Sequence, residues 1–269
     1  MSNYILIDGS YFVFYRFHAL KNWWTISQQE LGENISNIHE YPDFIKKFES
    51  TFAGKIHEIG KKLKIKNPRY IVGKDCPRDE IWRNDLIENY KTHRADASYI
   101  SKFFKMAYES LFRQAGVNVT LTYPKLEADD CIAITTNYLR EREPDCNVWI
   151  ITSDMDYLQL ASDNVHLFSL KYKSLTDSSM GSPEQDLFCK IVMGDKSDGI
   201  PSIFPKCGFK TTIKYLKDRD SFEKKLSESE TARALYKRNR TIIDFNYIPL
   251  ELREGFIEYI SENLAYLFL

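Results

Sequence analysis

Short apolar runs alternate with helix-like stretches along the first two thirds of this chain, and this alternation restricts the fold more than any other feature. The runs cover residues 4–7, 70–72, 117–121, 148–152 and 165–168. Between them, apolar residues recur at three- and four-residue spacing, which is typical of amphipathic helices. Strands that alternate with helices form a mostly parallel sheet with helices on both faces. The sequence therefore predicts an α/β fold.

Strand-like runs stop near residue 180, and the remainder of the chain has helical patterns. The predicted helices cover residues 184–193, 210–217, 221–238 and 251–267. Serine, glycine and proline cluster at residues 178–183, as at a boundary between two regions. We expect a core over residues 1–180 and a helical region over residues 181–269, packed as one unit with that core.

Acidic residues gather in three clusters, at residues 127–130, 154–156 and 195–198, and two further acids each lie at or just after a strand-like run. They are Asp8, Asp75, Glu127, Asp129, Asp130, Asp154, Asp156, Asp195 and Asp198. In open α/β sheets, ligands collect at the carboxyl ends of the strands. Crowded carboxylates repel one another unless cations lie between them, and hard oxygen ligands favour Mg²⁺ or Mn²⁺. The clusters predict a two-metal phosphodiesterase.

Each acidic residue also has a simpler structural explanation. Asp8 can belong to a turn or cap a helix after the first strand, and Ser153 or Asp154 can cap a helix. Three acids within residues 127–130 exceed what capping needs, even where they suit the helix dipole. On a helix, Glu127 and Asp130 share one face, so we expect Asp129 to point elsewhere and to act on metals only indirectly.

Composition restricts the partners, the kinds of site and the cellular location that the protein can have. The net charge is −1, so no overall positive field indicates nucleic acid, although an acid cluster would cancel basic patches in the sum. The five cysteines have no CxxC spacing, which argues against a zinc site or a disulfide framework. No signal peptide or membrane span is evident, so we expect a soluble, intracellular protein without a membrane partner.

Several motifs occur together in one order. They are Ile7-Asp8-Gly9, Tyr90-Lys91-Thr92-His93-Arg94, Glu127-Ala128-Asp129-Asp130, Ser153-Asp154-Met155-Asp156, and Gly194-Asp195-Lys196-Ser197-Asp198-Gly199. Together they resemble the structure-specific 5′ nuclease family of flap endonucleases and 5′-3′ exonucleases, which has a PIN-like fold. The likeness is nearest to the ribonuclease H group of T-even phages, and it extends to residues 226–230 and 243–249.

The resemblance implies roles for the matching residues. The nine acids would bind two Mg²⁺ ions, directly or through water, and Mn²⁺ would substitute. Lys91 would reach the scissile phosphate and Arg94 would steady it, with Arg83 a weaker candidate of the same kind. A helical arch at about residues 76–103 would admit a single-stranded 5′ end.

The same resemblance implies the substrates. We expect a 5′-3′ exonuclease and flap endonuclease that cuts DNA at 5′ flaps, nicks and other single-strand/double-strand junctions, with RNA/DNA hybrids as further candidates. Such an enzyme would remove RNA primers or 5′ flaps in DNA replication and repair. We expect it to be a monomer with replication proteins as its partners.

The helical region departs from the family at one turn. Many relatives grip duplex DNA there with a Gly-Ile-Gly-x-Lys hairpin, and this chain retains Lys206, Gly208, Lys210 and Thr211 as the candidates for DNA contact. Because this turn is altered, the sequence does not decide whether the family's potassium site is present. Three alternatives to a 5′ nuclease remain: a PIN-type ribonuclease, a non-catalytic junction-binding protein, and a domain without a functional site.

Overall fold

A five-stranded sheet forms the centre of the protein. The computed structural model describes residues 1–29, 37–88, 90–92 and 98–268. The strands are β1 (Asn3–Asp8), β2 (Arg69–Gly73), β3 (Val119–Leu121), β4 (Asn147–Ile151) and β5 (Val165–Phe168). Their order is β3-β2-β1-β4-β5 and every pair is parallel, which confirms the predicted sheet.

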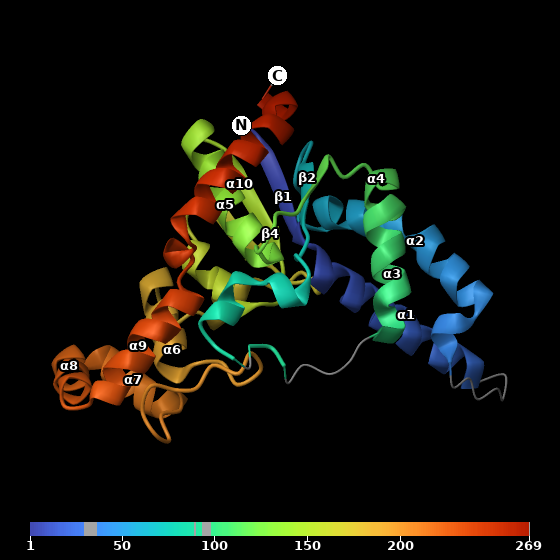
Figure 1. Ribbon diagram of the computed structural model, residues 1–269. Helices are drawn as coiled ribbons and strands as arrows, with labels where there is room; N and C mark the ends of the chain where they lie inside the picture. The colour runs from blue at the N-terminus through green and yellow to red at the C-terminus, as the bar shows by residue number, and fades with distance from the viewer. Residues whose placement is uncertain (30–36, 89, 93–97, 269) are drawn as a thin grey trace.

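Helices cover both faces of this sheet, as predicted (Figure 1). One face packs against α1 (Gly9–Gln29), α2 (Pro42–Lys62) and α3 (Ser101–Met106), which continues through the π-helix η5 (Ala107–Leu111) into α4 (Phe112–Gln114). The other face packs against α5 (Ala128–Arg142) and α10 (Leu250–Asn263). Side chains alternate along β1, so Ile5 and Ile7 enter one core while Tyr4 and Leu6 enter the other.

The chain after β5 is helical, apart from short turns. It contains α6 (Pro183–Met193), α7 (Phe209–Lys217), α8 (Arg219–Ser227) and α9 (Glu230–Ile243), which share an apolar cluster around Phe222. The single helix predicted over residues 221–238 was wrong. The Ser229 hydroxyl accepts the Ala232 backbone N–H and starts a second helix. Helix α10 belongs to the predicted helical region, but it returns to pack on α5 of the predicted core. The division at residue 180 therefore stays a prediction.

Short 3-10 helices fill the connections. They are η1 (Ile38–Glu40), η2 (Arg78–Glu80), η3 (Trp82–Asp85), η4 (Ser98–Ile100), η6 (Met155–Leu160), η7 (Leu175–Ser178), η8 (Phe245–Tyr247) and η9 (Ala265–Phe268). Three of them, η2 to η4, lie in the segment predicted as an arch, and Arg94 lies outside the described residues. Among the described helices, none is long and apolar enough to cross a membrane.

Candidate metal site and nucleic-acid interface

A cavity of about 460 Å³ opens at the carboxyl end of the sheet. Its position follows from the strand register, because Asp8 of β1 pairs with Gly73 of β2 and the neighbouring strand β4 ends beside them. The acidic residues that line it are Asp8, Asp75, Asp129, Asp154, Asp195 and Asp198. Six of the nine acids singled out in the sequence therefore lie around a single cavity, to which the segment after α6 contributes Asp195 and Asp198.

Two of these carboxylates connect the strands to the helices that follow. Asp8 accepts the backbone N–H of Tyr11 in the first turn of α1 at 2.9 Å. Asp75 accepts the Ser10 hydroxyl at 2.5 Å and the Ala128 backbone N–H at 2.8 Å. Asp75 thereby joins the first turns of α1 and α5.

The cavity carries more negative charge than the protein neutralises. Burial raises the pKa of Asp8 to about 7, and the nearby negative charge of Asp75 adds to the effect. Burial likewise raises the pKa of Asp156 to about 7, with Asp154 as the second cause. When burial and neighbouring carboxylates raise the pKa of a carboxyl group, the positive charges of the protein do not fully offset the negative charge there. A divalent cation would offset this negative charge and would be coordinated by the surrounding carboxylate oxygens. The residues present therefore fit the metal ions that the sequence predicts.

Asp154 has both of the roles considered for it. Its side chain accepts the Asp156 backbone N–H at 2.9 Å, which caps η6, and it also lines the cavity. A capping bond uses one carboxylate oxygen and leaves the other available. Capping therefore does not exclude metal binding here.

Lys190 of α6 is a cavity residue that the sequence reasoning missed. Its Nζ lies 2.7 Å from Asp156 Oδ1 and 2.7 Å from Asp195 Oδ2. Burial would raise the pKa of Asp195, but hydrogen bonds from Lys190 and Ser197 outweigh it and lower the pKa to about 2. In the sequence, Lys190 lies in a predicted helix, five residues before Asp195.

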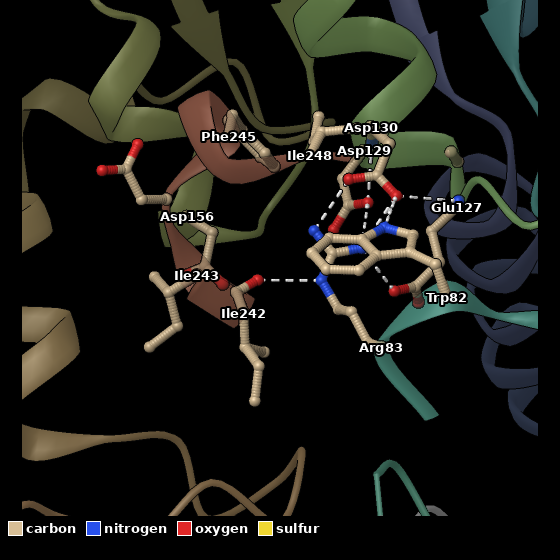
Figure 2. Close-up of polar contacts among 12 residues, drawn as sticks. Trp82, Arg83, Glu127, Asp129, Asp130, Asp156, Ile242, Ile243, Phe245 and Ile248 are labelled. Atoms are coloured by element: carbon tan, nitrogen blue, oxygen red, sulfur yellow. Dashed lines mark hydrogen bonds and ion pairs between the residues drawn. The ribbon is translucent and has the colours of Figure 1, made fainter. Parts of the chain in front are cut away.

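Arg83 organises the acidic end of α5 (Figure 2). Its guanidinium makes two hydrogen bonds to Asp130, at 2.7 and 2.8 Å, and a third to Glu127 at 2.9 Å. Its Nε donates to the Ile242 carbonyl at 2.8 Å, which connects η3 to α9. Arg83 is only 2% exposed. The suggestion that Arg83 contacts DNA is therefore corrected, because its donors are used inside the protein.

The same contacts reverse the expected roles on α5. Glu127 and Asp130 do share a face, but that face turns to Arg83, and Trp82 Nε1 also donates to Asp130 at 2.9 Å. Asp129 is the acid of this helix that lines the cavity. Oxygens of all three lie within 4.8 Å of one another. Arg83 lies 2.9 Å from Glu127 and 2.7 Å from Asp130 but 3.9 Å from Asp129, so Asp129 is the least neutralised of the three acids.

Lys91 places a positive charge at the edge of the cavity. Its ammonium pairs with Glu127 and lies 3.9 Å from Asp198 Oδ2, and its backbone N–H donates to the Asp198 carbonyl at 3.1 Å. Burial would lower the pKa of Lys91, but the negative charges around it, Glu127 first and then Asp129 and Asp198, together outweigh burial and raise the pKa well above its ordinary value. Lys91 is therefore a fixed cation beside the carboxylates.

The candidate DNA-contact residues of the helical region lie together at an exposed turn. Lys206 precedes the turn with a φ of +55°, and Gly208 caps α7 with open space around it. Lys206, Gly208 and Lys210 are exposed and Thr211 is half-buried. The Thr211 N–H donates to the Gly208 carbonyl at 3.0 Å, whereas the N–H groups of Phe209 and Lys210 make no backbone hydrogen bond among the described residues. This turn offers cations and backbone donors suited to phosphate.

The fold and the cavity define a class of protein, the α/β nucleases with a carboxylate cluster at the sheet edge. Comparison with known proteins gives the family. The family described as "5'-3' exonuclease, N-terminal resolvase-like domain" matches residues 3–185. The chain belongs to this 5′-3′ exonuclease family. It is accordingly an enzyme of the 5′ nuclease class, which confirms the expected phosphodiesterase.

Individual relatives agree with this membership. A 5′-3′ exonuclease of Buchnera aphidicola (from Acyrthosiphon pisum) is 27% identical over 87% of this chain and 77% of its own length. Ribonuclease H of Enterobacteria phage T4 is 29% identical over 70% of this chain and 68% of its own length. The D15 flap endonuclease of bacteriophage T5, solved with DNA and metal ions, superimposes with a TM-score of 0.66 at 18% identity, over 98% of this chain and 99% of that one. The last likeness shows the PIN-like, resolvase-like fold.

Proposed function

We propose that this protein uses two divalent ions, Mg²⁺ or Mn²⁺, to hydrolyse nucleic-acid phosphodiesters at single-strand/double-strand junctions. The observation that carries the proposal is the cavity itself, in which six carboxylates and two lysines converge at one edge of the sheet. The ions would be held by Asp8, Asp75, Asp129, Asp154 and Asp198. When bound, such ions activate water and stabilise charge on the leaving oxygen.

The remaining residues have distinct proposed roles. Glu127 and Asp130, fixed by Arg83, hold the start of α5 and so position Asp129. Asp156 and Asp195, joined through Lys190, connect η6 to the end of α6. Lys91 would offset the charge that builds on the phosphoryl oxygens, and Arg94 would steady the same phosphate.

We propose DNA with a 5′ flap or nick as the substrate, and an RNA/DNA hybrid as a second one. The D15 relative was solved with DNA and metal ions, and ribonuclease H of phage T4 carries an RNA-directed name. The turn at Lys206, Gly208, Lys210 and Thr211 would hold duplex phosphates without reading sequence. Such an enzyme would act inside the cell as a monomer beside replication proteins.

One experiment tests this function. Flap, nicked-duplex and single-stranded DNA, labelled at the 5′ or 3′ end, are incubated with the protein in Mg²⁺ or in EDTA. We expect a Mg²⁺-dependent cut near the flap junction, or stepwise release of short 5′ products from the nick. Faster cutting of RNA than of DNA at equal salt would instead indicate a PIN-type ribonuclease. Junction binding without cleavage would indicate a non-catalytic protein.

A further inference from the structure

A second cavity, of about 250 Å³, lies between α1, α2 and the loop that follows β5. Four of its residues are charged. Three are positive and one is negative: Arg16 of α1, Lys55 and Glu58 of α2, and Lys171 of the loop. Helix α1 separates it from the carboxylate cavity, because Tyr11 and Phe14 line the first cavity whereas Arg16 lines the second. The two cavities thus share one wall but have opposite charge.

The positive charge in this second cavity is only partly neutralised. Glu58 pairs with Lys55 at 2.6 Å. In the part of the chain that the structure describes, neither Arg16 nor Lys171 has a hydrogen bond or ion pair through its side chain. Burial lowers the pKa of Arg16 against the influence of Glu58. A half-buried guanidinium normally has acceptors for its donors, so the Arg16 donors are available to an anion.

The anion that fits is a phosphate group. Guanidinium groups bind phosphate through paired N–H donors, and Lys171 adds a second cation at the rim. The ring of Tyr15 also lines the cavity and its hydroxyl supplies a further donor, whereas the Tyr172 hydroxyl already forms a hydrogen bond with Glu58.

The position of the cavity identifies the source of the phosphate. Arg16 follows Asp8 by eight residues of α1, which is about 12 Å along a helix. Duplex strands advance about 3.4 Å per phosphate, so a strand spans that distance in about three or four nucleotides. The Leu170 backbone N–H donates to the Tyr11 hydroxyl at 3.0 Å, which fixes the loop to the same helix. We infer that this cavity binds a backbone phosphate of the nucleic acid whose scissile bond occupies the carboxylate cavity.

The choice of nucleic acid as the ligand rests on the proposed function. The contact would lie on the side of the sheet covered by α1 and α2, away from the basic turn at α7 (Figure 1). Nucleic acid would therefore be held on both sides of the carboxylates, which suits a junction with two arms.

The test compares two lysines of one loop in the full chain. Lys171→Ala removes a cavity cation, and Lys173→Ala removes an exposed cation of the same loop that does not line the cavity. Affinity for a labelled flap duplex is measured by fluorescence anisotropy in EDTA from 50 to 200 mM salt. We expect Lys171→Ala to weaken binding about 3- to 10-fold and to reduce the salt slope by about 0.9, as for one lost phosphate contact. Lys173→Ala should behave as the wild type.

Arg16→Gln is the second variant, with its melting temperature measured to confirm folding. A folded Arg16→Gln protein should lose at least as much affinity as Lys171→Ala. Wild-type affinity and salt slope in Lys171→Ala would overturn the inference, even if Arg16→Gln failed to fold. Inorganic phosphate is titrated in parallel. Saturable phosphate binding with unchanged DNA affinity in the variants would assign the cavity to a free anion and also overturn the inference.

Cleavage by the wild type separates this inference from the proposed function. If the wild type cuts flaps in Mg²⁺ while Lys171→Ala binds them normally, the proposed function stands and the phosphate cavity does not. If binding depends on Lys171 but no substrate is cut, the phosphate cavity stands and the catalytic proposal fails.

Discussion

Arg83 and Asp130 form a buried two-point ion pair, with Nη2···Oδ1 at 2.7 Å and Nη1···Oδ2 at 2.8 Å. Neither side chain is more than 3% exposed. They join η3 to the first turn of α5, and the Arg83 Nε bond to Ile242 adds the end of α9. Three segments that are distant in sequence therefore meet at one guanidinium, next to the carboxylate cavity.

Loss of this ion pair should destabilise the fold. Asp130→Asn leaves the Arg83 charge buried and less well compensated, which typically costs about 3–5 kcal/mol of the free energy of unfolding. Urea unfolding followed by circular dichroism measures the loss. The matched control is Glu109→Gln, since Glu109 pairs with Lys105 at 3.9 Å on the surface and should contribute less than about 1 kcal/mol. A stable but inactive Asp130→Asn protein would instead restore Asp130 as a direct metal ligand.

Asp154→Asn should abolish cleavage without unfolding the protein. The amide can still accept the Asp156 N–H that caps η6, so the local structure persists, but it removes a charge from the cavity. We expect kcat to fall by at least about 100-fold, since even groups that only orient metal ligands contribute 10- to 100-fold. Flap cleavage rates and junction binding are measured on the same preparation. Asp163→Asn, an exposed change just after η6, is the control. Full turnover by Asp154→Asn would contradict the metal assignment.

The sheet and most site acids were predictable because they depend on local pattern. Apolar runs predicted five strands, and parallel strands that end at one edge bring Asp8, Asp75 and Asp154 together. Helical spacing also predicted that Glu127 and Asp130 share a face. It did not predict which face turns to the cavity, because that depends on Arg83, 44 and 47 residues away.

Long-range partners explain the other differences. The burial of Arg83 depends on the Ile242 carbonyl, 159 residues later in the chain. The role of Lys190 depends on where α6 packs relative to η6, which brings Asp156 within 2.7 Å. Neither contact has a local signature in the sequence, so Arg83 was interpreted as a candidate for DNA contact and Lys190 was left unassigned.

Lys91→Ala should slow cleavage more than it weakens binding. The Lys91 ammonium lies at the cavity edge between Glu127 and Asp198, where it would stabilise charge that develops during the reaction. Removal of one such donor typically lowers kcat by about 100- to 1000-fold. Single-turnover cleavage and binding in EDTA separate the two effects. Lys62→Ala, a change of an exposed lysine in the last turn of α2 that does not line the cavity, serves as the control. Loss of binding with unchanged kcat would make Lys91 a docking residue.

Metal ions should stabilise the protein more strongly as pH rises. Burial and then Asp75 raise the pKa of Asp8 from 3.8 to about 7. The unfolded chain therefore releases this proton near pH 4, whereas the folded protein without metal keeps it until about pH 7. Since the folded state binds more protons in that window, the free energy of unfolding falls as pH rises through it. The melting temperature in EDTA should decrease between pH 5 and pH 8.

Divalent ions compete with the same protons, so the increase in melting temperature caused by Mg²⁺ should be small at pH 5 and largest at pH 8. Asp8→Asn removes the titrating group and should flatten the EDTA profile relative to the wild type, while Asp163→Asn should follow the wild type. This comparison also cancels the contributions of His18 and His166, whose pKa values burial lowers. A Mg²⁺ effect that is equal at both pH values would contradict binding of the ions at Asp8, because a ligand that must lose a proton cannot bind metal independently of pH.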